Sequence, residues 1–147
     1  MEDYFYHFCM LPTTDKDPTM IDNVQKTETL ITQILLLDLY QQKRKNVFDY
    51  LVKNHSEIQL NDGIFYTMCI SNDLNRLKQY WSQFKLNNRT VEQSFFVAVI
   101  NDRIKLAKWL LGKYYDLLVP LLPEIKKTYV KSKLDQTNIS MILILTI

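Results

Sequence analysis

Apolar residues recur every three or four positions from Thr19 to Gly112, which is the spacing of one face of an α-helix. Polar breaks divide this stretch into successive segments. The pattern predicts six helices, over residues 19–40, 47–54, 63–70, 74–84, 91–100 and 104–111. Thr19 or Asp22 is the predicted N-cap of the first helix and Asp73 that of the fourth. Gly112 is predicted to end the sixth helix in a left-handed conformation.

The segments on either side of these helices are less regular. Residues 1–19 begin with the aromatic and apolar run Tyr4–Leu11, which is expected to lie on the first helix and cover its apolar surface. The alternative is a short recognition peptide. A basic helix is predicted at Glu124–Leu134. The final stretch, Ile139–Ile147, is apolar and is expected to pack against the rest of the protein, with its secondary structure left open.

A repeat is visible in the middle of the chain. Placing Asn72 and Asp73 on Asn101 and Asp102 gives an offset of 29 residues, and an offset of 30 aligns a second set of apolar positions. A fainter copy lies one period upstream. Each unit is a helix, a short turn, a second helix and a polar loop, and stacked units of this kind share a continuous core. The sequence therefore predicts an all-α fold, a short helix-turn-helix solenoid of about three pairs with terminal capping segments.

The repeated segments resemble the second half of an ankyrin repeat. The match to that family's second helix is carried by Ile104, Ala107, Lys108, Leu110 and Leu111 in one copy and by Leu74, Leu77 and Lys78 in the other, and Ala98 matches one of the family's paired alanines. The Thr-Pro-Leu-His start of the family is missing. Asn72 or Asp102 stands where the family has a glycine. Repeats that depart in this way are similar to those of large cytoplasmic DNA viruses (African swine fever virus multigene families, poxviruses, giant viruses) and of intracellular bacteria.

The resemblance implies a protein-binding role. In ankyrin-like proteins the concave face and the loop tips contact partners, which here points to two short loops as partner-binding sites. The residues implied are Asn61, Asp62, Gly63, Asn87, Asn88 and Arg89. For a viral protein, the resemblance further implies a host partner in signalling or innate immunity.

Composition narrows the alternatives. A chain of 147 residues is long enough for one core, and we expect a single domain over 1–147 with an N-terminal segment (1–19), helix-pair repeats (20–115) and a C-terminal cap (116–147). Only two glycines occur, which argues against phosphate-binding loops and nucleophile elbows. A net charge of +2 is too mild to indicate nucleic-acid binding. No apolar run is long enough for a membrane span. Two cysteines cannot form a disulfide framework and residues 1–10 lack the pattern of a signal peptide, so we expect a cytoplasmic location.

Candidate chemistry is sparse, and we expect no catalytic residues, no cofactor and no metal. His7 and Cys9 supply only two potential zinc ligands, whereas zinc takes three or four from protein. Cys69 falls at a small-residue position of its repeat, which favours a packing role. Trp81 and Trp109 are expected to pack between helices. The lysines at 126, 127, 131 and 133 are interpreted as a solvated face.

These observations favour a non-enzymatic protein–protein interaction module. The alternative from another structural class is a compact helical bundle, similar to viral Bcl-2-like proteins, that binds partner helices in a groove. A third possibility is a small hydrolase that uses His55. The partner is expected to be a protein and not a nucleic acid. If the chain is viral, the partner is expected to be a host protein.

Overall fold

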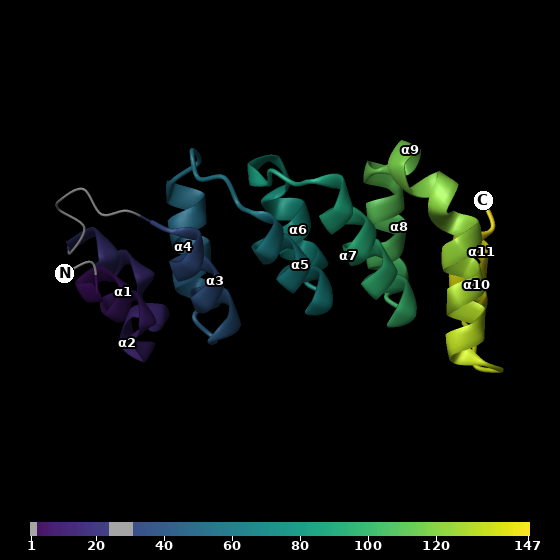
Figure 1. Cartoon of the computed structure of the whole chain (residues 1–147). Helices are drawn as coiled ribbons and strands as arrows, with labels where there is room; N and C mark the ends of the chain where they lie inside the picture. Colours follow the sequence, from purple (N-terminus) through teal and green to yellow (C-terminus); the bar gives the residue numbers. More distant parts are fainter. Residues whose placement is uncertain (1–2, 24–30) are drawn as a thin grey trace. The chain divides into compact units, whose positions relative to one another are not determined.

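The computed structural model describes residues 3–23 and 31–147, and every regular element in these ranges is helical (Figure 1). The all-α prediction is therefore confirmed. The chain divides into two compact units, Met1–Ile64 and Phe65–Ile147, which are described separately below. The single domain expected from the chain length stays a prediction.

Unit 1 contains two helical hairpins. Its elements are α1 (Asp3–Met10), α2 (Pro12–Lys16), the 3-10 helix η1 (Pro18–Asn23), α3 (Gln33–Gln41) and α4 (Lys45–Asn54). Helix α1 packs on α3 and α2 packs on α4, so the hairpins stack first helix on first helix and second on second. Phe5 and Cys9 are buried in this contact. The N-terminal segment thus covers apolar surface, as expected from its sequence.

The predicted start of the helix over residues 19–40 is wrong. Thr19 and Asp22, its predicted N-caps, lie inside η1. Helix α3 begins only after Thr32, whose side-chain oxygen accepts a hydrogen bond of 3.1 Å from a backbone N–H of the first turn. The predicted helical positions 24–30 lie outside the described residues. The apolar period continues through this region, but the period alone does not locate the cap that starts a helix.

Unit 2 repeats the stacking seen in unit 1. Its elements are α6 (Leu74–Gln79), η2 (Trp81–Gln83), α7 (Asn88–Ile100), α8 (Ile104–Lys113), α9 (Tyr115–Leu118), η3 (Val119–Leu121), α10 (Leu122–Lys133) and α11 (Ile139–Leu145), and α5 (Asp62–Ile70) crosses the unit boundary. Helices α7 and α8 form a hairpin, α10 packs on α7, and α11 packs on α8. The apolar C-terminal stretch is therefore a helix, and Asn138 caps its start.

The turns inside the helical pairs share one unusual backbone conformation. Lys43, Asn72 and Asp102 have positive φ values of 63°, 55° and 55°. In each pair the N–H of the next residue donates to the carbonyl oxygen five residues back, at 2.9, 2.9 and 2.8 Å. This is the Schellman arrangement that ends a helix in the left-handed region. The spacing of the three residues, 29 and then 30, shows that both offsets seen in the sequence occur.

The same relative positions are buried in each of these pairs. Counted from the left-handed residue, positions −8, −7, −4, −3, +5 and +8 are less than one-tenth exposed in all three. They are Leu35, Leu36, Leu39, Tyr40, Phe48 and Leu51 in the first pair, Ile64, Phe65, Met68, Cys69, Leu77 and Tyr80 in the second, and Ser94, Phe95, Ala98, Val99, Ala107 and Leu110 in the third. The burial pattern follows the repeat even where residue types differ. Cys69 has the packing role expected of it.

The predicted role of Gly112 is wrong. Helix α8 continues through this residue to Lys113, and no glycine in the chain has a positive φ. In the described residues, the left-handed conformation at helix ends is adopted by non-glycine residues such as Asn72 and Asp102. Asparagine and aspartate tolerate this conformation because their short polar side chains can hydrogen-bond to the local backbone. Gly112 suggested a stop because glycine is the commonest residue at left-handed helix ends.

Candidate protein-binding groove

The first predicted partner-binding loop is the start of α5. Asn61 accepts a hydrogen bond of 3.1 Å from the Ile64 N–H through its side-chain oxygen, and its own N–H donates to Gln33 at 3.1 Å. Asn61 and Gly63 are exposed, while Asp62 is half-buried. The loop is thus held against α3 and serves as a helix start. Its part in partner binding stays a prediction.

The second predicted loop is the start of α7. The side-chain oxygen of Asn87 accepts a 2.9 Å hydrogen bond from the Thr90 N–H, which makes it the N-cap, and Asn88 and Arg89 are exposed in the first turn. The first loop belongs to unit 1 and this one to unit 2. Their binding role also stays a prediction.

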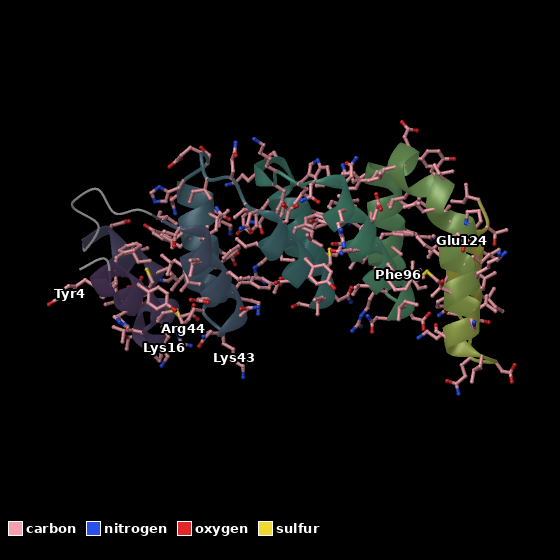
Figure 2. The ribbon with its side chains drawn as sticks, viewed as in Figure 1. Tyr4, Lys16, Lys43, Arg44, Phe96 and Glu124 are labelled. Atoms are coloured by element: carbon pink, nitrogen blue, oxygen red, sulfur yellow. The ribbon has the colours of Figure 1, made fainter. Side chains whose placement is uncertain are left out.

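A groove on the first helices of unit 2 was not found by sequence reasoning. It encloses about 500 Å³. Its lining residues are Tyr66 from α5, Glu92, Gln93, Phe96 and Val97 from α7, and Leu121, Glu124 and Ile125 from η3 and α10. Phe96 and Glu124 come from neighbouring helices in Figure 2, and α7 and α10 are in contact. We call this surface the α7–α10 groove.

Helix α7 presents apolar residues on two sides. Phe95 is fully buried, whereas its neighbour Phe96 is 37% exposed and lines the groove. Glu92 and Phe96 are four residues apart, so they lie one above the other on the same face of the helix. On α10, Glu124 and Ile125 follow Leu121 by three and four residues and face the groove in the same way. The Phe95-Phe96 doublet, with a glutamate one turn before it, is the sequence signal that could have located this surface.

The electrostatic character of the groove is negative. Two carboxylates line it and no lysine or arginine does. Within the described part of the chain, Glu92 is half-buried and makes no hydrogen bond or ion pair through its side chain. Glu124 pairs with Lys127 at 3.7 Å, but both side chains are about four-fifths exposed, so this pair is screened by solvent. The groove therefore combines an apolar lining with two carboxylates that can pair with a cation.

A second groove lies between α8 and α11. It encloses about 440 Å³ and is lined by Lys108, Leu111, Gly112, Tyr115, Ser140, Leu143, Ile144 and Ile147. Leu143 on α11 and Ile147, two residues after the helix, are 67% and 66% exposed, so this end of unit 2 carries uncovered apolar side chains. Lys108 is its one charged lining residue.

The residues considered for catalysis or metal binding do not converge. His7 is exposed while Cys9 is fully buried, so they do not share a surface. Burial raises the pKa of both cysteine thiols, Cys9 and Cys69, to about 12, and at Cys69 it outweighs the Ser94 hydroxyl, which acts to lower the pKa. Both thiols therefore stay protonated and weakly nucleophilic near neutral pH. Among residues 3–23 and 31–147, no three His, Cys, Asp or Glu side chains are grouped to hold a metal ion.

His55 lies outside any such cluster. Its imidazole Nδ1 is 3.4 Å from a carboxylate oxygen of Glu57, in the loop after α4, and its side chain is 28% exposed. This contact is local, between residues two apart. It supplies one acidic neighbour and no nucleophile.

The two tryptophans pack together as expected. The Trp81 and Trp109 rings meet edge to face with centroids 5.2 Å apart, and Tyr114 contacts Trp81 at 5.4 Å. Trp81 lies in η2 and not in α6, because α6 ends at Gln79, so the predicted helix 74–84 was too long. The cluster is part of the packing of unit 2.

The lysines of α10 do not form one uniform solvated face. Lys133 pairs with Asp102 at 2.9 Å, and Lys127 pairs with Glu124. Lys126 is half-buried, while Lys131 is exposed.

Three comparisons with known proteins were negative. A scan against protein-family models found no match, and searches of curated proteins and of solved structures found no significant match either. Across the described residues, no helix combines the length and the apolar character needed to cross a membrane.

Proposed function

We propose that this chain is a non-enzymatic protein–protein interaction module with its binding surface at the α7–α10 groove. The observation that carries the proposal is the exposed Phe96 ring in the lining of this groove, which also contains two carboxylates and no cation. Concave, mostly apolar surfaces that carry a few polar groups are the usual ligand-binding sites of proteins. A protein segment is the ligand that such a groove on packed helices commonly binds.

The stacking of the helical pairs supports a short ankyrin-like solenoid as the scaffold. In each unit, first helices contact first helices and second helices contact second helices. The turn geometry shared by Lys43, Asn72 and Asp102 supports a repeated helix-pair unit. In solenoids of stacked helix pairs each pair contacts its neighbours, and the α7–α10 groove lies on the first helices of unit 2. The proposed partner is a cytoplasmic protein, a host protein if the chain is viral.

Site-specific photo-crosslinking tests the proposal. Phe96→p-benzoylphenylalanine places the reactive group on the groove floor, and Tyr115→p-benzoylphenylalanine places it in the second groove as a matched control. In cells that naturally contain the protein, we expect one protein adduct from position 96 that position 115 does not give. The captured protein, purified, is expected to bind with a Kd below about 10 μM, and to lose binding with Phe96→Ala but not with Tyr115→Ala. Equal adducts from both positions, or none from position 96, would contradict the proposal.

A further inference from the structure

We infer that the partner segment carries an arginine or lysine next to a large apolar side chain, with the cation held between Glu92 and Glu124. This inference rests on the proposed function, because it specifies what the α7–α10 groove recognises. It is carried by the charge of the groove lining and by the chemistry of the groove floor.

The negative charge of the groove differs from the net charge of the whole chain. The chain as a whole has a net charge of +2, yet the groove lining contains two carboxylates and no cation. Glu92 is half-buried and has no partner among the described residues, so part of its hydration is already lost without a compensating contact. A cation from a partner would supply that contact. An anionic ligand, such as a phosphate group, would be repelled by both side chains.

The floor of the groove suits the apolar part of the same segment. Phe96 offers an exposed ring, and Val97 and Ile125 extend the apolar surface beside it. Tyr66 adds a second aromatic ring at the α5 side. A guanidinium or ammonium group near these rings gains a cation–π contact in addition to its ion pair. Arginine also covers apolar surface with its methylene groups.

Selection from a random dodecapeptide phage library against the purified full-length chain tests the inference. We expect the enriched peptides to combine arginine or lysine with leucine, phenylalanine or tryptophan. One enriched peptide, labelled with fluorescein, is then titrated in fluorescence anisotropy against wild type, Glu92→Gln, Glu124→Gln and Phe96→Ala. The control is Asp116→Asn, which removes an exposed carboxylate of the same unit away from the groove lining.

The charge contacts have a quantitative signature. We expect Glu92→Gln and Glu124→Gln each to weaken binding about three- to fivefold, and Asp116→Asn to leave it unchanged. Replacing the peptide arginine with citrulline, which keeps the shape and removes the charge, is expected to weaken binding to wild type but not to the Glu92→Gln/Glu124→Gln double variant. Raising the salt from about 50 to about 500 mM weakens the wild-type complex more than the double variant.

The failures of this inference and of the proposed function are distinguishable. Peptides that lose binding with Phe96→Ala but ignore both glutamine variants would overturn the inference on charge and leave the groove as a binding site. Peptides that ignore Phe96→Ala as well, or a selection that enriches nothing, would overturn both. Self-association in sedimentation velocity that is lost with Glu92→Lys would assign the groove to a second copy of the chain, and that result also overturns the inference.

Discussion

The carboxylate of Asp102 accepts a hydrogen bond from the buried hydroxyl group of Tyr129, which lies 27 residues further along the chain. Lys133 adds an ion pair to the same carboxylate at 2.9 Å. The Tyr129 oxygen in turn accepts the Asn138 N–H at 2.8 Å. One turn residue of the third helical pair is thereby tied to α10 and to the start of α11. These contacts connect the C-terminal hairpin to the rest of unit 2.

Asp102 is expected to make unit 2 less stable as the pH falls into the acidic range. Burial acts to raise the pKa of Asp102, but the Tyr129 hydrogen bond and the Lys133 charge outweigh it and lower the pKa below its ordinary value of 3.8. A lowered folded-state pKa contributes stability above the unfolded-state pKa, and this contribution is lost as the pH falls through the folded-state value. We expect wild type to lose more unfolding free energy than Asp102→Asn between about pH 5 and about pH 3.

Urea unfolding followed by tryptophan fluorescence measures this difference. Both tryptophans of the chain, Trp81 and Trp109, lie in unit 2, so their signal reports that unit. Asp116→Asn, an exposed carboxylate replaced in the same way, is the matched control and is expected to follow wild type. Parallel pH profiles for wild type and Asp102→Asn would show that the Tyr129 and Lys133 contacts do not favour the charged carboxylate.

Gly112→Ala is expected to stabilise unit 2. Gly112 lies inside α8 without a positive φ, and a Cβ built on it has no other atom within 4 Å. Glycine in a helix costs about 0.5–1 kcal/mol relative to alanine because the unfolded glycine has more backbone freedom. The midpoint of urea unfolding, read from tryptophan fluorescence, should rise accordingly. If Gly112→Ala were less stable than wild type, that result would indicate a left-handed conformation at Gly112 and contradict its place inside α8.

Substitutions at Asn72 are expected to rank by their tolerance of positive φ. At φ 55°, Asn72→Gly should be within about 0.5 kcal/mol of wild type, while Asn72→Ala should cost about 1 kcal/mol. Asn72→Val should cost more, because a β-branched side chain is the least tolerant of this region. Ser71→Ala, one residue earlier and also exposed, is the control for the loss of a polar side chain. Equal effects of glycine and valine would argue against the left-handed turn.

Adjacent phenylalanines of α7 should behave in opposite ways. Phe95 is fully buried, so Phe95→Ala should cost about 3–5 kcal/mol of unfolding free energy through lost burial and the cavity left behind. Phe96 is 37% exposed on the groove floor, so Phe96→Ala should cost about 1 kcal/mol or less. The measurement is the same urea titration. This result matters for the binding experiments, because it separates loss of binding from loss of folding; comparable costs at both positions would place Phe96 in the core.

Local sequence signals located most of the helical structure. The three-to-four spacing of apolar residues indicated five of the α-helices near their observed positions, and Asp73 was recognised as a cap from its place before Leu74. Two predicted boundaries were wrong. Thr32 caps α3 inside an apolar stretch, and α8 passes through Gly112 and ends at Lys113.

The candidate groove was predictable only in part. Glu92 and Phe96 stand one helical turn apart in the sequence, and that spacing marks a common face. The contribution of α10, through Glu124 and Ile125, depends on contacts between residues about thirty positions apart, which no local pattern encodes. The residues predicted as loops at 61–63 and 87–89 form helix starts, because Asn61 and Asn87 each accept a backbone N–H of the first turn. Asn88 and Arg89 therefore lie in α7 and not in the loop before it.

By itself, the sequence determined that this protein is all-α, built from helical pairs that repeat every 29 or 30 residues, because helix periodicity and capping act within a few residues. Only the tertiary structure decided that Asp102 meets Tyr129 and Lys133, that the C-terminal stretch is a helix on α8, and that α7 and α10 enclose a groove. These features depend on which helix packs against which. That choice minimises exposed apolar surface over the whole unit, so it cannot be read from any one segment.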